Sequence, residues 1–435
     1  MISGQRSKDP RVWLETAPPP VFGKERAFLF YILTAPSRRR GFFIQLILRE
    51  LTNRMKLTEI KEMLNKRINL ISPVLSVIIV LTFVIGGTGC TDSKKEAGPA
   101  TREVTDISGR RVNVPVYPRR VATMPGPIYE MVFMLGAKDQ IGLVRQDHAT
   151  VYPLALLTNP ELAGYPKIAN VGPRTPVNIE EYLKNDVDLV IYYNIPQELK
   201  KFDMAGLPAV VLNLNGNAGQ APADIDEAIA DLDERIRFTS EVLGGDAPGK
   251  YRRWSGYLHD TVERIRSRTS KIPRSEYPVV YWANSWGPNL LATYITRTNK
   301  YFIELCGGKL AGPEKGGKFP EITREQLLVW EPEVIIVDNH GRNPTVVIEE
   351  LRTDADWASL PAVKSDRIHR IPSGVFFLDK ASSKVVFFLW LAKKLHPEIF
   401  QDVDMVQEMK YYFETFYNYK MTTEEAEKAL QGWGR

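Results

Sequence analysis

Two segments of the chain repeat one arrangement of polar and apolar positions. In residues 321–339, EITREQLLVWEPEVIIVDN, a short amphipathic run leads into an unbroken apolar run, and residues 177–194, VNIEEYLKNDVDLVIYYN, have the same order. The first part of each copy predicts a short helix. The segments 187–193 and 334–337 are rich in aliphatic and β-branched residues without alternation, and so predict strands that are covered on both faces in a parallel sheet.

A residue that favours helix starts opens each predicted helix. Asn178 has a glutamate three positions later, Glu181, and Thr323 is followed at the same spacing by Gln326. This spacing predicts that the two side chains satisfy backbone donors at the helix start. Each copy also has a glutamate at the second helical position, and these two residues are Glu180 and Glu325.

The same alternation of apolar runs and helical spacing extends over most of the chain. It predicts a hairpin that turns at Ser108-Gly109, further strands at 120–123, 140–144, 278–283 and 367–371, and helices at 129–135 and 300–305. We therefore predict an α/β fold with two lobes that both contain a parallel sheet, at residues 103–222 and 271–400. A helical linker at 223–270 lies between them, and two C-terminal helices at 401–435 pack on the second lobe.

The segment before these lobes has the pattern of an export signal. A run of sixteen apolar or small residues, 70–85, follows Lys66 and Arg67 and precedes small residues and Cys90. Because a permanent membrane helix needs about twenty apolar residues, we predict a signal peptide at 55–89 and a tether at 90–102. An uncleaved membrane anchor is the alternative. Residues 1–54 have no usable periodicity, and an over-extended start is our interpretation of them.

Charge and composition exclude several classes of protein. The 435 residues carry a formal charge of +5, but residues 1–89 contribute +8, so the folded part is slightly acidic and does not suggest a nucleic-acid partner. With two cysteines, Cys90 and Cys306, no cysteine metal cluster forms, and the five histidines contain no zinc-hydrolase spacing. The run GPEKGGK at 312–318 lacks the Ser/Thr of a phosphate-binding loop.

The opening of the first lobe resembles a known family. The run DISGRRVNVPVYPRRV, followed by Glu130, by Leu135-Gly136 and then by IGLV, is similar to the start of the periplasmic binding proteins that serve iron-siderophore and cobalamin ABC importers. The resemblance covers nearly all of residues 103–400. It implies two Rossmann-like lobes joined by a long helix, no catalysis, no cofactor, and an ABC permease with its ATPase as partners of a monomer.

The resemblance also gives roles to particular residues. Small residues before Cys90 are similar to a lipoprotein cleavage site, although Gly87 departs from the usual aliphatic residue there, so Cys90 is the predicted lipid attachment point. In the family a glutamate on each lobe meets arginines of the permease. The motifs NIEE and TREQ match the family at these positions, so the resemblance implies the docking role for Glu180 and Glu325.

Ligand contacts are expected at the carboxyl ends of the parallel strands. Aromatic walls with a few cations suit a bulky anionic chelate, which favours a ferric siderophore, with cobalamin or haem as alternatives. His148 and His340 are weak candidates for direct metal ligation. A metal-cluster protein and a membrane-tethered hydrolase are the rival classes. The predicted ligand residues are Pro125, Tyr129, Arg145, Gln146, Tyr193, Asn194, Trp282, Asn284, Trp286, Asn339, His340, Arg342, Phe376 and Phe377.

Overall fold

The computed structural model describes residues 100–124, 126–146, 153–168, 176–212, 222–283, 297–312, 322–338 and 344–433. All of them belong to one compact unit, Glu96–Arg435. Within these ranges no helix is both long enough and apolar enough to cross a membrane. The interpretations of residues 1–54, of the signal peptide and of Cys90 fall on residues outside the described ranges, and they stay predictions.

Five parallel strands form the first sheet, in the order β5-β4-β3-β6-β7. Four parallel strands form the second sheet, in the order β11-β10-β8-β9. The strands of the first sheet are β3 (Val121–Thr123), β4 (Ile141–Arg145), β5 (Lys167–Ile168), β6 (Leu189–Tyr192) and β7 (Ala209–Val211). Those of the second are β8 (Val279–Ala283), β9 (Lys309–Leu310), β10 (Val334–Val337) and β11 (Ile368–Arg370). The two predicted parallel sheets are confirmed, with strand ends shifted by one or two residues.

Successive residues of each strand enter different cores, as the unbroken apolar runs predict. In β6, Leu189 and Ile191 join a central core, whereas Val190 joins a second core on the other face of the first sheet. In β10, Ile336 joins the same central core and Ile335 joins a third core. Both sheets are therefore covered on both faces, and one core is shared by the two sheets.

Helices of the first lobe follow their strands closely in the chain. They are α6 (Gly126–Met134), α8 (Pro153–Thr158), α9 (Ile179–Lys184) and α10 (Pro196–Met204), with the 3-10 turns η1 (Lys138–Gln140) and η2 (Pro160–Gly164). Gly136, which follows α6, has a positive φ of 74°. Glycine adopts this conformation without steric cost, and it ends the helix as the sequence predicts.

The second lobe contains α13 (Arg297–Leu305), α14 (Arg324–Trp330), α15 (Pro344–Thr353), α16 (Pro361–Lys364) and α17 (Lys384–Leu395), with η3 (Arg274–Glu276) and η4 (Ala381–Ser383). Helix α17 is apolar on nearly all sides, and its residues from Val385 to Ala392 are all buried. Cys306, which follows α13, is buried and free, and burial raises the pKa of its thiol.

The hairpin β1 (Thr101–Thr105) and β2 (Arg111–Pro115) is antiparallel and turns through Gly109, as predicted. Buried Asp106 fixes it to the first sheet. One carboxylate oxygen accepts hydrogen bonds from the backbone N–H groups of Ser108 and Arg110, each at 3.0 Å. The other accepts one from the N–H of Val211 in β7 at 3.1 Å.

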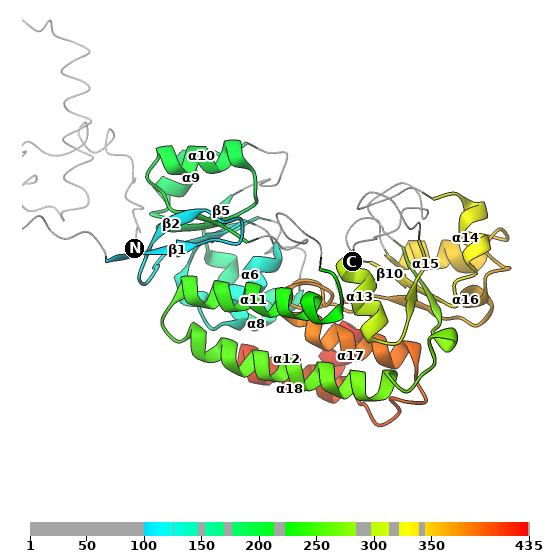
Figure 1. Ribbon diagram of the computed structural model, residues 1–435. Coiled ribbons are helices and arrows are strands. Elements are labelled where there is room, and N and C mark those ends of the chain that lie inside the picture. The colour runs from blue at the N-terminus through cyan, green and yellow to red at the C-terminus, as the bar shows by residue number, and fades with distance from the viewer. Residues whose placement is uncertain are drawn as a thin grey trace, which may run out of the picture. The chain divides into compact units, whose positions relative to one another are not determined.

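Two long helices, α11 (Ile225–Leu243) and α12 (Ala247–Thr269), form the predicted linker and pack against each other (Figure 1). Each helix buries an apolar face, which includes Leu232 and Ile236 of α11 and Trp254 and Leu258 of α12. Helix α12 also packs against α17, and the indole N–H of Trp254 donates to the Ser382 carbonyl at 3.1 Å.

The C-terminal helices α18 (Met405–Tyr417) and α19 (Thr423–Leu430) pack against each other. Helix α18 contacts α17 of the second lobe and also α6 of the first lobe. The tail therefore contacts segments from both lobes.

The two predicted helix starts differ in detail. Thr323 and Gln326 form the complete reciprocal box at the start of α14, as do Thr422 and Glu425 at α19. Asn178 caps the start of α9 as predicted, but its side chain accepts from the N–H of Glu180 at 3.2 Å. The predicted pairing of Asn178 with Glu181 is therefore wrong, because the short asparagine side chain bonds to the N–H two residues ahead.

Candidate ligand site

A cation and a phenol meet at the carboxyl edge of the first sheet. Arg145 ends β4 and Tyr193 directly follows β6, with β3 between the two strands. The Arg145 guanidinium donates to the Tyr193 hydroxyl at 3.4 Å, and both side chains are partly buried. Both residues were predicted at the ligand site because they follow strand ends, and the structure brings them together although they are 48 residues apart in the sequence.

Two predicted neighbours lie beside this pair. Gln146 and Asn194 each follow a member of the pair in the chain, and both are exposed. The backbone N–H of Gln146 donates to the Ile168 carbonyl at 3.0 Å, which fixes the chain at the end of β4. Tyr193 packs edge-on against Tyr192, with ring centroids 5.5 Å apart. The local arrangement offers an arginine and polar side chains to an anion.

Two aromatic residues that we predicted at the ligand belong to the core. Tyr129 and Trp282 are each 2% exposed. The Tyr129 hydroxyl accepts from the Asn159 side chain at 3.3 Å, and the Trp282 ring packs against Phe387 with centroids 5.6 Å apart. Both side chains belong to the central core. The structure therefore gives Tyr129 and Trp282 a packing role and does not place them at a ligand surface.

Phe376 and Phe377 follow β11 and pack edge-to-face, with ring centroids 4.7 Å apart. Phe377 is buried and Phe376 is partly exposed. Close by in the chain, the Lys380 ammonium pairs with the buried Asp379 carboxylate at 2.6 Å. This turn therefore combines an aromatic surface with fixed charges at the carboxyl end of the second sheet.

The remaining predicted ligand and metal residues fall outside the described ranges. They are Pro125, His148, Asn284, Trp286, Asn339, His340 and Arg342. In the part of the chain that the structure describes, no group of three or more His, Cys, Asp or Glu side chains is arranged to hold a metal ion.

The sequence analysis missed a group of charged residues at one end of α17. Arg235 of α11 is 4% exposed and donates to both carboxylate oxygens of Asp231 at 2.7 Å. Lys384 begins α17, and its ammonium lies 4.6 Å from the centre of the Phe302 ring. Burial lowers the pKa of Lys384 to about 7, and the nearby charges of Lys380, Asp379 and Arg235 also act on it. No local sequence pattern relates positions 235 and 384.

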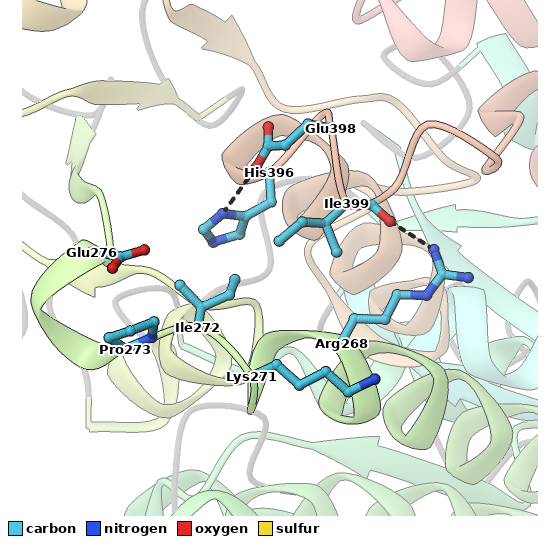
Figure 2. A pocket seen from close by; sticks show the side chains of 8 residues that line it. All are labelled: Arg268, Lys271, Ile272, Pro273, Glu276, His396, Glu398 and Ile399. Atoms are coloured by element: carbon cyan, nitrogen blue, oxygen red, sulfur yellow. Dashed lines mark hydrogen bonds and ion pairs between the residues drawn. The ribbon is translucent and has the colours of Figure 1, made fainter.

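An open hollow lies at the opposite end of the second lobe, where α12, η3 and the end of α17 meet (Figure 2). Arg268 donates to the Ile399 carbonyl at 3.0 Å, and the His396 ring nitrogen Nδ1 lies 3.8 Å from Glu398. Glu276 lies just before β8, so this hollow is at the amino ends of the strands. Ligands of open parallel sheets bind at the carboxyl ends, which separates the hollow from the candidate site.

The two predicted docking glutamates occupy equivalent positions. Glu180 is the second residue of α9 and Glu325 the second residue of α14, and both are exposed. The Glu325 carboxylate accepts from its own backbone N–H and from the Thr323 hydroxyl, and these hydrogen bonds hold the pKa of Glu325 below its usual range. Each helix also exposes an apolar residue about one turn later, Leu183 on α9 and Val329 on α14.

Comparisons with known proteins agree with this architecture. A family model described as periplasmic binding protein matches residues 121–375. The chain is 26% identical over 334 residues to the molybdate-binding protein MolA of Haemophilus influenzae, covering 73% of this chain and 91% of that protein. It is 21% identical to a vitamin B12-binding protein of Yersinia pestis over 44% of this chain and 66% of that protein.

Solved structures share the fold. The structure of Haemophilus influenzae MolA bound to molybdate gives a TM-score of 0.64 at 21% identity, covering 74% of this chain and 99% of that one. A periplasmic solute binding protein from Veillonella parvula gives 0.62 at 22% identity, covering 76% and 97%. At these identities the likeness concerns the fold alone.

Proposed function

Because the chain belongs to the periplasmic binding protein family, we propose that it captures an anionic metal species outside the cytoplasmic membrane for an ABC importer. Membership places it among the solute-binding proteins of ABC transporters, which are transport proteins and act outside the cytoplasm. The main support for an anionic cargo is the Arg145–Tyr193 pair at the carboxyl edge of the first sheet. A guanidinium and a phenol both donate hydrogen bonds to oxygen anions.

Two kinds of cargo fit this chemistry, and we rank a metal oxyanion of the molybdate type first. Its support is the similarity to MolA, which extends over 91% of that protein. The ferric-siderophore-type chelate is the second candidate, since the partly exposed Phe376 ring, which packs on Phe377, offers aromatic surface to a bulky ligand. Cobalamin and haem follow as further chelates, and the vitamin B12-binding relative covers 44% of this chain.

Calorimetric titration of the full chain, purified in detergent, tests the cargo. The panel contains molybdate, tungstate, sulfate, a ferric catecholate, a ferric hydroxamate, cobalamin and haem. Saturable binding of molybdate and tungstate with weaker sulfate binding supports the oxyanion, and saturable binding of a ferric chelate alone moves the assignment to the second candidate. Absence of binding to every compound would overturn the anionic-metal proposal.

A substitution at the site separates cargo binding from general charge effects. We expect Arg145→Gln to weaken binding about tenfold or more, since a hydrogen bond to a charged group contributes about 1.5–3 kcal/mol. Arg111→Gln is the control, because Arg111 is an exposed arginine of the hairpin that pairs only loosely with Glu103, at 3.7 Å. Equal affinities of the two variants would remove Arg145 from the site.

We also propose the contacts with the membrane and the importer. Glu180 and Glu325 dock the two lobes on arginines of the permease, and the ATPase acts through that permease. Their equivalent exposed positions on α9 and α14 support this role. Lipid attachment at Cys90 after removal of residues 55–89 would hold the monomer at the membrane. Incorporation of a radiolabelled fatty acid that is lost in Cys90→Ser tests the anchor.

A further inference from the structure

Lys384 is a lysine whose charge has no counter-ion in the described part of the chain. Its side chain is only partly exposed, and its ammonium lies over the Phe302 ring at 4.6 Å. Among the described residues no hydrogen-bond acceptor or carboxylate contacts this ammonium. An ammonium that is partly removed from water without an acceptor costs free energy, and such groups are normally paired.

Arg235 presents a second donor without an acceptor. Its Nη2 atom is held by Asp231, but its Nη1 atom is buried and has no hydrogen-bond partner among the residues that the structure describes. Arg235 lies on α11, which contacts both α13, the helix of Phe302, and η4, the turn before Lys384. The positive charge of Arg235 is one of those that lower the pKa of Lys384.

The charges of the described residues that act on Lys384, namely Lys380, Asp379, Arg235 and Asp231, do not neutralise its ammonium. Asp231 pairs with Arg235, and Asp379 pairs with Lys380 at 2.6 Å, so the two pairs are neutral. Lys384 adds one positive charge to them. A single small anion would neutralise this charge and would also accept from the free edge of the Arg235 guanidinium.

We propose that a small inorganic anion binds between α11, α13 and the start of α17, held by the Lys384 ammonium and the Arg235 guanidinium. The site is distinct from the strand-end residues Arg145 and Tyr193, and it does not depend on which cargo the protein carries. Bound there, the anion would connect the linker helix α11 to α17 of the second lobe. Chloride and a tetrahedral oxyanion share the required chemistry.

Thermal unfolding of the full chain in detergent tests the site. Sodium gluconate is replaced stepwise by chloride, sulfate or molybdate at constant ionic strength, below neutral pH, where Lys384 with its pKa of about 7 carries its charge. We expect a saturable rise of the unfolding midpoint that Lys384→Met abolishes. Saturation by chloride identifies a monovalent anion, and saturation by sulfate or molybdate without chloride identifies a tetrahedral oxyanion; either result supports the site when Lys384→Met abolishes it.

Lys393→Met is the matched control. Lys393 lies on the same helix, but its ammonium already donates to the carbonyls of Phe400 and Val403, at 3.0 and 2.7 Å. This variant should lose stability and keep the anion response. A response of the same size in Lys384→Met, or no response in the unaltered chain, would overturn the proposal.

Amine labelling of the unaltered protein gives an independent readout that needs no variant. An opposite charge close to an ammonium raises its pKa by about 1–3 units, so the neutral, reactive fraction of Lys384 at neutral pH should fall about fivefold or more when the anion binds. Mass spectrometry of the labelled peptides measures this change, with Lys393 as the internal control. Unchanged labelling of Lys384 in saturating chloride, sulfate and molybdate would exclude the site.

Discussion

Glu130 is a buried carboxyl group that connects three segments far apart in the sequence. It lies on α6 and is 1% exposed. The Ser382 backbone N–H donates to it at 3.2 Å and the Ser383 hydroxyl at 2.8 Å, and the hydroxyls of Ser382 and Tyr417 donate to it as well. Burial raises the pKa of Glu130, while these hydrogen bonds oppose the shift.

This raised pKa predicts a pH-dependent stability. A carboxyl group whose folded pKa exceeds its ordinary value of 4.5 contributes stability that is full below 4.5 and is lost as pH rises through the folded pKa. We expect Glu130→Gln to remove this loss, which amounts at most to about 1.4 kcal/mol per pH unit for one proton. Urea unfolding between acidic and neutral pH measures the slope.

Glu198 provides a control of opposite sign. Burial raises the pKa of Glu198, but hydrogen bonds from Lys201, at 2.9 and 3.0 Å, and from the Val177 N–H outweigh burial, so the pKa is lowered. Its contribution is present above 4.5 and lost as pH falls through the lowered pKa. Glu198→Gln should therefore destabilise the protein more at neutral than at acidic pH. Parallel pH profiles for the two variants would contradict this assignment.

At the scale of elements, two glycines allow the effect of backbone conformation on stability to be measured without a change in packing. Gly256 lies within α12 and Gly206 follows α10; both are exposed, and an added Cβ would meet nothing within 4 Å at either. Gly206 has a φ of 67°, whereas Gly256 is helical. We expect Gly256→Ala to raise the free energy of unfolding by about 0.5–1 kcal/mol and Gly206→Ala to lower it by about 1 kcal/mol. Chemical denaturation checks both, and a common sign would contradict the conformational explanation.

Local chemistry explains which elements the sequence predicted well. The Thr323–Gln326 box and strand β10 follow from side chains within one short segment, and both appear as expected. The cap at α9 was assigned to the wrong partner because Asn178 can reach the N–H two or three residues ahead, and only the folded backbone selects one.

The site was less predictable because its geometry is tertiary. The rule on strand ends brought Arg145 to Tyr193, since all parallel strands of one sheet end at the same edge. The same rule failed for Trp282, because the last residues of a strand still alternate between its two faces and Trp282 faces the central core. Arg235 and Lys384 lie on separate helices, and only the packing of α11 against η4 relates them.

At the scale of the whole described unit, the central core is continuous through both sheets. It contains Val121 of the first sheet, Val334 of the second, residues of α11 and α12, and nearly all of α17. Hinge bending between the sheets would expose this shared apolar surface, at about 25 cal/mol for each Å². A largely preformed site with small adjustments on binding is therefore the expected behaviour.

In a rigid unit of this kind, a change of the docking charges should alter uptake without altering the affinity for cargo. We expect charge reversal of Glu180 or Glu325 to lower importer-dependent uptake about tenfold each, because an exposed interfacial charge sets association and orientation at the permease. The double reversal should abolish uptake. The affinity for cargo should not change, since both side chains are exposed and neither belongs to the predicted ligand residues. Uptake by cells and calorimetry of the purified variants measure the two quantities.

Glu424 supplies the control for this last experiment, because it has the same position at a helix start, although it also pairs with Lys428 at 2.6 Å, so its reversal should cost the helix at least as much stability. It is the second residue of α19, exposed, and preceded by a threonine that caps the helix. Its reversal removes the same favourable interaction with the helix dipole, about 0.3–1 kcal/mol, without touching the predicted docking positions. If Glu424→Arg lowers uptake as much as Glu325→Arg does, the loss arises from the destabilised helix, and the paired glutamates have no special role in docking.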